Sequence, residues 1–334
     1  MRVVAVDDPV VPRGEVLVKV DAAGMCGSDR HIVGGTYPST PPVTLGHEFE
    51  GTVVATGEET SLAVGEHVTV DPNISCGRCA SCRSGLVSHC ESLSALGVQR
   101  DGGLAEFVVV PERQAYLLPD GVPLGVGALC EPLACCLRGL DHATIRPGDA
   151  VAVFGGGVMG QLLVQLARLA GATRVVLVTR QSERREMACS LGATHAVDPE
   201  AGDVVSVIAG TSGIVPGGVD VAFEAAGVPE TFLAALEVTR RRGRVVVVGA
   251  APQETKVEVR PFDLFARELQ VQGSFLNPFT HGRAVKLVGD GALTLAPLIT
   301  SRVSLEEVPE ILSRAPRRGE IKTLAMPSWT SPRS

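Results

Sequence analysis

The chain has 334 residues, of which 45% are hydrophobic and 20% charged, and its 30 basic and 37 acidic residues give a formal net charge of −7. This composition is typical of a packed globular protein, and the length favours two domains because one hydrophobic core stops growing at about 250–300 residues. Neither charge forms long runs and 4% of the residues are aromatic, which argues against a nucleic-acid partner. No apolar run approaches the roughly 20 residues of a membrane span, so we expect no membrane partner.

Short β-branched segments, separated by Gly, Pro and Asp, make up residues 1–125. They include EVLVKVDAAG, FEGTVVATG, EHVTVDP and AEFVVVP. Runs of this length and composition are typical of strands, and their close succession predicts antiparallel, barrel-like β structure.

Helix-like and strand-like segments alternate from about residue 133. A helix-like LACCLRGLDHA is followed by a strand-like AVAVF, and then by QLLVQLARLAG, RVVLVT, RREMACSLG, VDVAFEAAG, FLAALEVTR and GRVVVVGA. Such alternation predicts βαβ units in a doubly wound parallel sheet. Short mixed segments return after about residue 275, and we expect this tail to pack back onto the β-rich part because it is too small to fold alone.

A glycine-rich turn joins the first of these strands to the next helix. Gly155, Gly157 and Gly160 have G-x-G-x-x-G spacing within AVAVFGGGVMGQLLVQLA. Glycine allows the tight turn and lets backbone N–H groups approach a pyrophosphate, whose charge the helix N-terminus favours. The motif alone is a weak signal, but its place between a strand and an amphipathic helix predicts a dinucleotide-binding site.

The residue about twenty positions after this motif distinguishes NAD from NADP. An acidic residue there would accept the ribose hydroxyls of NAD, but this chain has Thr179, followed by Arg180, Arg184 and Arg185. A neutral residue removes the repulsion of a 2′-phosphate, and a guanidinium can bind that phosphate through two hydrogen bonds. The sequence therefore favours NADP. The alternative is NAD, with Arg180 as a solvated loop residue.

Four cysteines of a total of nine lie between residues 76 and 90. Cys76, Cys79, Cys82 and Cys90 have C-x2-C-x2-C-x7-C spacing. Four thiolates are the ligand set of a closed, tetrahedral structural zinc site. This spacing and the odd number of cysteines indicate a reducing, cytoplasmic setting without disulfides.

A second set of metal ligands is dispersed along the chain. Cys26 lies in AAGMCGSDRH, His47 and Glu48 in LGHEFEG, and Glu131 in LCEPLACC. One Cys, one His and a carboxylate can hold zinc and leave a position for a substrate oxygen. Each residue also has a structural interpretation: His47 as a hydrogen-bonded core histidine, and Glu131 as a carboxylate at a helix N-terminus.

Together these motifs resemble a known family. CGSDRH, GHEFEG, the four-cysteine segment, CEPL and GGGVMG occur in the order and spacing of zinc-dependent medium-chain dehydrogenases, in particular of the branch with sorbitol, threonine and glucose dehydrogenases. The resemblance covers nearly the whole chain. Family members usually carry a further strand before the segment that matches Val3 to Val20, so the resemblance leaves open whether the first β-hairpin forms.

The resemblance implies two domains. Residues 1–132 and 276–334 would form a GroES-like, β-rich catalytic domain with a structural zinc lobe at about 72–93, and residues 133–275 a Rossmann domain. The structural zinc ligands would be Cys76, Cys79, Cys82 and Cys90. Those of the catalytic zinc would be Cys26, His47 and either Glu48 or Glu131, which can exchange with water in this branch. Asp29 would orient His47, as a metal-bound imidazole requires.

The resemblance also implies alcohol oxidation by hydride transfer to a nicotinamide. Ser28 would accept the alcohol proton and pass it, through the cofactor ribose, to His31, since histidine is the residue type best suited to carry a proton near neutral pH. Without the resemblance, Ser28 is a turn-forming hydroxyl and His31 a surface residue. The residues expected along the cofactor are Gly155, Gly157, Val158, Met159, Gly160, Thr179, Arg180, Arg184, Ala226 and Gly249.

The substrate is less well defined than the reaction. Polar residues predicted to line its pocket are Tyr37, Arg100, Asp101, Asn277 and Glu131, and they suit a polyol, sugar, aminocyclitol or aminoglycoside better than an aliphatic alcohol. Arg100 and Asp101 are equally well interpreted as a solvated loop pair. We expect a small hydroxylated substrate and a homodimer or homotetramer.

Three other functions remain open at this point. They are a simple secondary-alcohol or threonine-type dehydrogenase, an enoyl or quinone reductase of the same superfamily, and a zinc- and nucleotide-binding protein without turnover. The reductases lack the zinc ligands, so a count of about two metal ions per chain would exclude them.

Overall fold

The computed structural model describes residues 1–327, so the last seven residues of the predicted catalytic domain, 328–334, lie outside the described residues. The chain divides into two compact units. Unit 1 comprises Met1–Ala134 together with the segment from Leu276 onward, and unit 2 comprises Cys135–Phe275.

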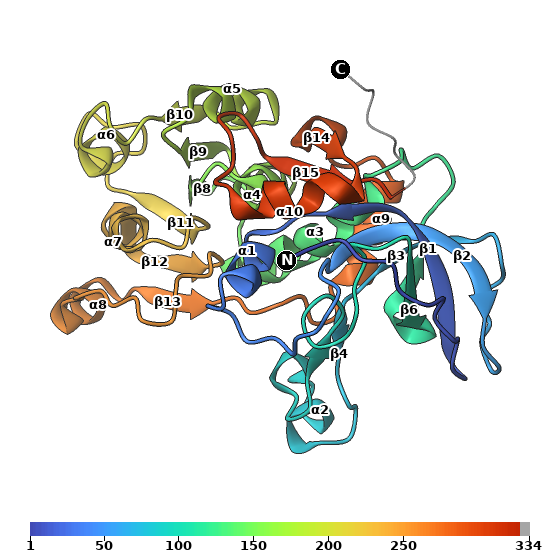
Figure 1. Ribbon diagram of the computed structural model, residues 1–334. Coiled ribbons are helices and arrows are strands. Elements are labelled where there is room, and N and C mark those ends of the chain that lie inside the picture. The colour runs from blue at the N-terminus through green and yellow to red at the C-terminus, as the bar shows by residue number, and fades with distance from the viewer. Residues whose placement is uncertain (328–334) are drawn as a thin grey trace. The chain divides into compact units, whose positions relative to one another are not determined.

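Unit 1 is built on a seven-stranded, largely antiparallel sheet with the order β14-β15-β1-β2-β3-β7, in which β6 also pairs with β1 (Figure 1). A separate two-stranded sheet joins β4 and β5. The strands of the unit are β1 (Glu15–Gly24), β2 (Glu48–Thr56), β3 (His67–Val70), β4 (Asn73–Ile74), β5 (Ser94–Ala95), β6 (Phe107–Pro111), β7 (Ala115–Leu117), β14 (Ile299–Val303) and β15 (Lys322–Ala325).

The C-terminal segment completes this sheet. Strand β15 pairs antiparallel with β1, with Ala23 opposite Ala325 and Gly24 opposite Leu324, and parallel with β14. The prediction that the tail returns to the β-rich part is therefore confirmed. This pairing places the residues of β15 beside the end of β1 that leads to Cys26.

Strand β1 shows why these residues form a half-buried sheet. Val16, Val18 and Val20 are fully buried and alternate with more exposed residues. Alternate residues of a strand point to the same face, so the three valines face one core, which also contains Phe49 and Val53 of β2.

The helices of unit 1 are short, apart from one. The α-helices are α1 (Gly27–Val33), α2 (Ala80–Arg83), α3 (Cys130–Ala143), which continues into unit 2, α9 (His281–Gly289) and α10 (Val308–Ser313). The 3-10 helices are η1 (Val87–His89), η2 (Glu112–Gln114), η3 (Gly127–Leu129), η4 (Ala296–Leu298) and η5 (Leu305–Glu307).

Unit 2 has a six-stranded sheet with the order β10-β9-β8-β11-β12-β13, in which every neighbouring pair is parallel. The strands are β8 (Ala150–Phe154), β9 (Arg174–Val178), β10 (His195–Val197), β11 (Val219–Glu224), β12 (Thr239–Val247) and β13 (Gln270–Gly273). The helices are α4 (Val158–Leu169), α5 (Ser182–Ser190), α6 (Val204–Ala209), α7 (Pro229–Val238) and α8 (Pro261–Arg267). The predicted fold class, a GroES-like β-rich domain plus a Rossmann-type parallel sheet, is confirmed.

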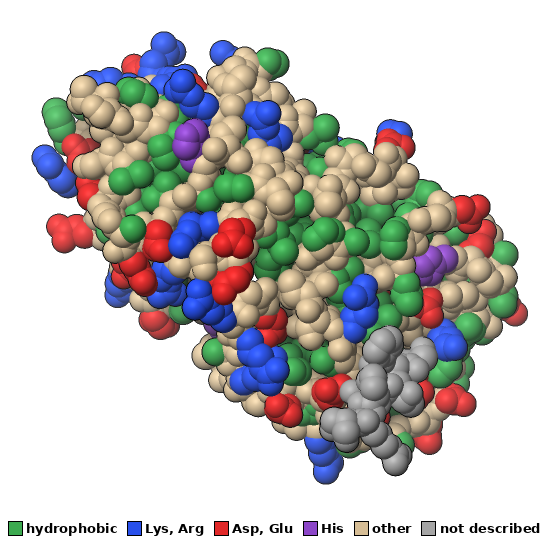
Figure 2. Space-filling view, turned by 90° about the horizontal axis from the view of Figure 1, so that it is seen from above, with side chains coloured by type: hydrophobic (Ala, Val, Ile, Leu, Met, Phe, Trp, Pro, Cys, Tyr) green, Lys and Arg blue, Asp and Glu red, His purple; other side chains and the backbone are tan. Residues whose placement is uncertain are grey.

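The surface of the described residues carries both charges. On the face shown in Figure 2, basic and acidic side chains are interspersed, with hydrophobic side chains between them. Within residues 1–327, we find no helix that is both long and apolar enough to cross a membrane.

A buried histidine of unit 1, His281, should make the stability of the folded chain sensitive to acid. Within the described residues neither ring nitrogen of His281 has a hydrogen-bond partner, and the ring packs against Tyr116 with centroids 4.8 Å apart. Burial lowers the pKa of His281 to about 3, so the folded chain keeps it neutral while the unfolded chain protonates it below its ordinary pKa of 6.5. Stability is therefore lost as the pH falls from 6.5 towards 3, by about 2 kcal/mol at pH 5.

Urea unfolding at pH 7.5 and pH 5.0 tests this expectation. His281→Leu removes the titrating group and should lose less stability on acidification than the wild type. His195→Gln, which changes an exposed histidine, serves as the control and should behave like the wild type. An equal loss in the wild type and in His281→Leu would contradict the prediction.

Candidate functional site

The glycine-rich turn of unit 2 is required by close backbone packing. Gly155 has φ of +110°, and a Cβ there would lie 2.9 Å from the backbone of Ala225. A Cβ at Gly160 would overlap the carbonyl oxygen of Gly155, and one at Gly156 would lie 2.7 Å from Oγ1 of Thr179. Helix α4 begins directly after Gly157. The N–H groups of its first turn have no acceptor within the helix and point out of its N-terminal end, so they can bind an anion.

The segment after β9 carries the residues predicted to select the cofactor. Arg180 is exposed and Thr179 half-buried. The Nη1 of Arg185 donates to the carbonyl oxygens of Thr179 and Arg180, and its Nη2 lies 3.0 Å from Oδ2 of Asp198. Arg185 thus fixes the backbone of this turn and leaves the Arg180 side chain at the surface. The carbonyl oxygen of Arg184 accepts a hydrogen bond from Gln161 on α4.

Sequence reasoning missed Glu224, which organises the turns that hold Ala226 and Gly249. It is 2% exposed, and its Oε1 accepts hydrogen bonds from the N–H groups of Ala226 and Gly227 at 2.9 and 2.8 Å. The N–H of Gly249 donates to the carbonyl oxygen of Glu224 at 2.8 Å. An acidic residue directly after the three buried apolar residues 221–223 of β11 was the available signal.

The four clustered cysteines of unit 1 converge as their spacing predicts. All four sulfur atoms lie within 4.8 Å of one another, and the Cys76–Cys82 and Cys79–Cys90 pairs are 4.0 Å apart. Zinc–sulfur bonds of about 2.3 Å in a tetrahedron place the sulfurs about 3.8 Å apart, so the donor set fits zinc. The N–H groups of Arg78 and Cys79 lower the pKa of Cys76 to about 6, which favours the thiolate that metal binding requires.

A second donor cluster lies at the junction of β1, α1 and β2. The ligand atoms of Cys26, His47 and Glu48 lie within 4.8 Å of one another. Cys26 is the N-cap of α1, whereas His47 directly precedes β2 and Glu48 is its first residue. One sulfur, one imidazole nitrogen and one carboxylate oxygen also fit zinc, and fewer than four protein ligands leave a position for a substrate.

Asp29 holds His47 in place and also caps helix α1. Its Oδ2 accepts a hydrogen bond from the N–H of Cys26 at 2.8 Å, and its Oδ1 lies 3.3 Å from Nδ1 of His47. Burial lowers the pKa of His47, but the carboxylate of Asp29 and then Cys26 outweigh it, so the pKa stands well above its ordinary value. Nδ1 is therefore the ring nitrogen that lies against Asp29. Nε2 faces Oγ of Ser28 at 3.2 Å and is the nitrogen available to a metal.

Sequence reasoning also missed Lys322, the first residue of β15. It is 2% exposed, and its Nζ contacts Oε2 of Glu48 and the carbonyl oxygen of Met25, the latter at 3.1 Å. Burial lowers the pKa of this ammonium, but the nearby Glu48, Cys26 and Glu131 raise it by more. The pKa of Lys322 therefore stands above its ordinary value. A lone lysine 274 residues from its partner gives no local sequence signal.

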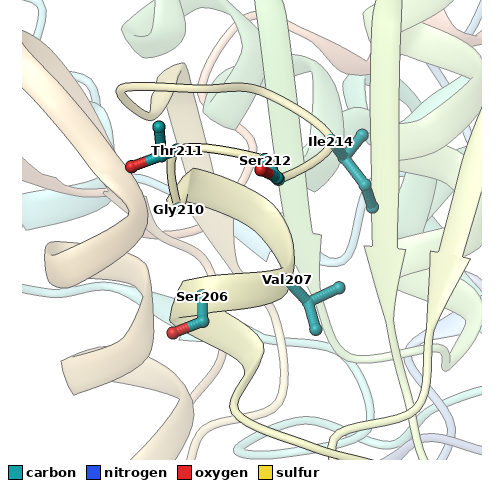
Figure 3. Close-up of a pocket in the computed structure, with 7 residues that line it drawn as sticks. Ser206, Val207, Gly210, Thr211, Ser212 and Ile214 are labelled. Carbon is teal, nitrogen blue, oxygen red and sulfur yellow. The ribbon is translucent and has the colours of Figure 1, made fainter.

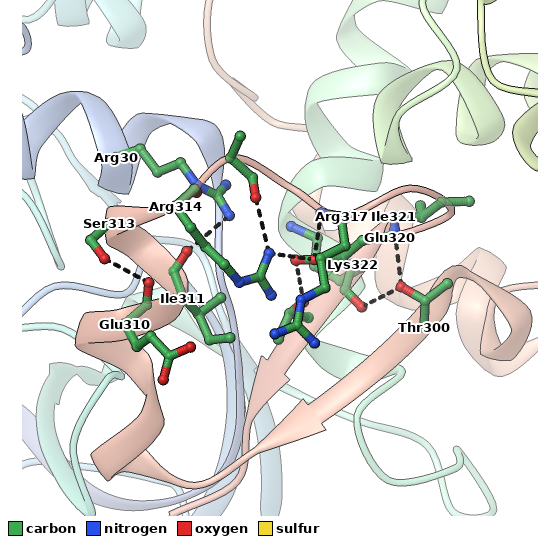
Figure 4. Close-up of polar contacts among 12 residues, drawn as sticks. Arg30, Thr300, Glu310, Ile311, Ser313, Arg314, Arg317, Glu320, Ile321 and Lys322 are labelled. Atoms are coloured by element: carbon green, nitrogen blue, oxygen red, sulfur yellow. Dashed lines mark hydrogen bonds and ion pairs between the residues drawn. The ribbon is translucent and has the colours of Figure 1, made fainter.

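Polar contacts fasten the segment before Lys322 to helix α1 (Figure 4). Arg30 of α1 donates to the carbonyl oxygens of Ile311 and Arg314 at the end of α10. Arg314 in turn lies 2.9 Å from Oε2 of Glu320. This network connects the helix that bears Asp29 to the strand that bears Lys322.

The other two predicted catalytic residues are not part of the three-residue donor cluster. Glu131, in the first turn of α3, is 7% exposed and is not among the three clustered ligands, although its charge acts on Lys322. His31 on α1 is exposed, and its Nδ1 lies 3.1 Å from Oγ1 of Thr36.

Backbone packing between glycines places His47. The N–H groups of Gly102, Gly103 and Leu104 donate to carbonyl oxygens of residues 44–46. A Cβ at Gly102 would overlap the carbonyl oxygen of Gly46, and one at Gly97 would lie 2.6 Å from it. The backbone of residues 102–104, directly after Asp101, therefore packs against the backbone of the residues that precede His47.

Three of the predicted substrate-pocket residues have partners within the chain. Arg100 lies 3.1 Å from both carboxylate oxygens of Glu15, and Oδ1 of Asp101 accepts from the N–H of Thr44 at 2.7 Å. Asn277 is 1% exposed and hydrogen-bonds to Asn73 and Asp71. The structure thus shows structural contacts for these three residues, and their contact with a substrate stays a prediction. Tyr37 is 37% exposed.

A surface cavity of about 760 Å³ lies over the C-terminal end of α6 in unit 2 (Figure 3). Its walls include Ser206, Thr211, Ser212 and Ile214, and none of its lining residues is titratable. It offers no acid, base or metal ligand, so we do not place the chemistry there.

Comparison with protein families gives two matches. The alcohol dehydrogenase GroES-like domain matches residues 12–120, and the zinc-binding dehydrogenase domain matches residues 158–287. Sorbitol dehydrogenase from Bacillus subtilis (strain 168) is 30% identical over 313 residues, which cover 92% of this chain and 88% of that protein. Scyllo-inosose 3-dehydrogenase from Thermotoga maritima is 34% identical over 345 residues, covering 94% and 86%.

Solved structures agree with this assignment. A protein described as a zinc-binding dehydrogenase from Sinorhizobium meliloti 1021, crystallised with NADP, is 52% identical with a TM-score of 0.94, covering 96% of this chain and 94% of that one. Galactitol-1-phosphate dehydrogenase from Escherichia coli is 29% identical with a TM-score of 0.86, covering 97% of each chain. The chain belongs to the zinc-dependent alcohol dehydrogenase family and is an oxidoreductase.

Proposed function

We propose that this chain oxidises a secondary alcohol of a polyol, sugar or aminocyclitol-type substrate to a ketone and transfers the hydride to NADP⁺. The observation that carries the proposal is the cluster of Cys26, His47 and Glu48, with Asp29 behind His47 and Ser28 in front of it. A structural cysteine or a core histidine alone would not need this arrangement of donors around one point.

Two zinc ions per chain would be held by different ligand sets. Cys76, Cys79, Cys82 and Cys90 would hold a structural ion, and Cys26, His47 and either Glu48 or Glu131 a catalytic one. When bound, the catalytic ion supplies Lewis acidity that lowers the pKa of the substrate hydroxyl. Asp29 lies against Nδ1 of His47 and so orients the ring, and Nε2 would be the nitrogen that holds the ion.

Ser28 is positioned to accept the proton that the alcohol loses. Its Oγ lies 3.2 Å from Nε2 of His47, beside the ligand atoms of the cluster. We infer that Ser28 would pass this proton on towards His31, which is exposed and could release it to water.

The cofactor would lie along unit 2. Gly155, Gly157, Val158, Met159 and Gly160 would hold the pyrophosphate at the start of α4. Ala226 and Gly249, on the turns organised by Glu224, would flank the nicotinamide half. NADP is favoured over NAD because Thr179 is neutral and the exposed Arg180 can meet a 2′-phosphate, and Arg184 of α5 follows closely. The 52% identical structure with NADP bound supports this choice.

The relatives support a polyhydroxylated substrate. Their names include sorbitol, L-idonate and scyllo-inosose dehydrogenases. The alternative, a threonine-type dehydrogenase, has support from an L-threonine 3-dehydrogenase that is 35% identical over 79% of this chain.

We also propose a cytoplasmic homodimer or homotetramer. Strand β13 forms one edge of the unit 2 sheet, and all four of its residues are exposed. Phe262, Phe265 and Phe275, close to it in sequence, are 66%, 78% and 51% exposed. An unpaired edge with exposed aromatic side chains is suited to pairing with a second copy.

A substrate screen tests the proposed function. Purified chain is incubated with sugars, polyols, aminocyclitols, threonine and simple secondary alcohols, each with NADP⁺ and with NAD⁺, and the absorbance of the reduced nicotinamide is followed. We expect the highest kcat/KM with a cyclic or acyclic polyol and NADP⁺. A higher kcat/KM with NAD⁺ would overturn the cofactor assignment, and turnover of threonine alone would overturn the substrate class.

A further inference from the structure

Glu50 is a fully buried carboxylate in β2 that none of the proposed steps uses. It follows Glu48 by two residues, so both side chains leave the strand on the same face. Glu48 faces the metal ligands and Lys322, whereas Glu50 faces the chain segment that leads into helix α3.

The contacts of Glu50 are with backbone N–H groups at the start of that helix. Its Oε1 accepts a hydrogen bond from the N–H of Gly125, and the N–H groups of Gly127 and Ala128 also face the carboxylate. Burial raises the pKa of Glu50 to about 7, and these three N–H groups oppose the rise. Gly125 has φ of +93°, and a Cβ at Gly127 would overlap Oε2 of Glu50, so the turn is shaped around the carboxylate.

Thr69 holds the same turn from the neighbouring strand. It lies opposite Glu50 in the β2–β3 register, and its Oγ1 donates to the carbonyl oxygen of Gly127 at 2.8 Å. Glu50 thus accepts hydrogen bonds from N–H groups of this turn, and Thr69 donates one to a carbonyl oxygen of the same turn. Neither residue is more than 1% exposed, so water does not compete for these contacts.

The turn leads without interruption to Glu131. Helix η3 covers Gly127–Leu129 and α3 begins at Cys130, so Glu131 is only four residues beyond Gly127. The charge of Glu131 acts on Lys322, which contacts Glu48. The place of Glu131 relative to the metal ligands is therefore set by how η3 is attached to β2.

We propose that Glu50 is a positioning residue, whose buried carboxylate attaches the start of η3 and α3 to β2 and so holds Glu131 within reach of an ion bound by Cys26 and His47. The inference rests on the proposed function, because it presumes a metal ion at that cluster. A purely structural role would appear as lost stability alone, because replacement of Glu50 leaves buried N–H groups without their acceptor.

Metal binding by three variants tests the proposal. Glu50→Gln keeps the size and one acceptor oxygen, whereas Glu50→Leu keeps the size and removes both acceptors. Val53→Ala, at a fully buried core position of the same strand, is the control for lost stability. Each variant is titrated with Co²⁺ after zinc removal, and the visible spectrum at the Cys26–His47 site and the competition by a chelator are recorded.

We expect Glu50→Gln to weaken metal binding at this site on the order of tenfold and Glu50→Leu to weaken it more, because residues that orient metal ligands have effects of about 10–100-fold. The four-cysteine site should bind as in the wild type in every variant. Val53→Ala should lower the urea midpoint without changing either metal affinity. In Glu131→Gln, the further change Glu50→Gln should add little, because both act through the same carboxylate.

Two results would overturn the inference. If Glu50→Gln and Glu50→Leu lose stability but keep the Co²⁺ spectrum and affinity of the wild type, Glu50 is a structural residue only. If effects of Glu50→Gln and Glu131→Gln add fully, Glu50 does not act through Glu131. Failure of the wild type to bind a second metal ion per chain would instead remove the proposed function itself, and the inference with it.

Discussion

Cys26→Ser is expected to abolish alcohol oxidation while the chain stays folded and keeps one zinc ion. Serine is a poor zinc ligand at neutral pH, so the cluster of Cys26, His47 and Glu48 loses its thiolate. Polarisation of a substrate oxygen by a metal is worth several kcal/mol, so we expect kcat/KM to fall by at least about 1,000-fold. Elemental analysis should find the zinc content reduced from about two ions per chain to about one.

The same substitution at two other cysteines provides matched controls. Cys189 is exposed on α5, and Cys189→Ser should change neither zinc content nor kcat/KM. Cys76→Ser should instead lose the zinc of the four-cysteine site and lower the unfolding midpoint, with the chemical step in the remaining folded chain little affected. Near-normal turnover in Cys26→Ser would contradict the assignment of the catalytic cluster.

The features predicted from the sequence are those encoded by residues close together in the chain. The four cysteine sulfurs converge because all four cysteines lie within residues 76–90. The short helices α2 and η1 between them bring the sulfurs close to one another. The turn at Gly155 is recognisable for the same reason, since the strand, the glycines and the helix are consecutive. The proposed catalytic ligands are dispersed, and their prediction depended on resemblance to a family rather than on spacing.

Two of the residues that sequence reasoning did not identify act over long separations. Lys322 meets Glu48 across 274 positions, and Glu50 meets Gly125 across 75. The contact of the Arg100 guanidinium with Glu15, 85 positions away, is a third such pair, and it leaves the prediction of Arg100 in a substrate pocket untested. Such pairs follow from strand register and loop packing, neither of which a local pattern specifies.

Lys322→Met is expected to destabilise the chain by about 3–5 kcal/mol. The ammonium and the carboxylate of Glu48 are each almost fully buried, and removal of one partner leaves an uncompensated buried charge. Methionine fills a similar volume, so the loss reflects the charge rather than a cavity. Urea unfolding of the zinc-free chain measures it.

Lys286→Met is the matched control, because it removes the same group from an ion pair with Asp290 in which both side chains are more than half exposed. Exposed pairs contribute about 0–1 kcal/mol, so this variant should unfold almost as the wild type does. If the two variants lose the same stability, Lys322 does not serve as the counter-ion of Glu48. Saturating zinc should restore part of the loss in Lys322→Met, because a cation at the Cys26–His47 cluster gives Glu48 a new partner, but it should leave Lys286→Met unchanged relative to the wild type.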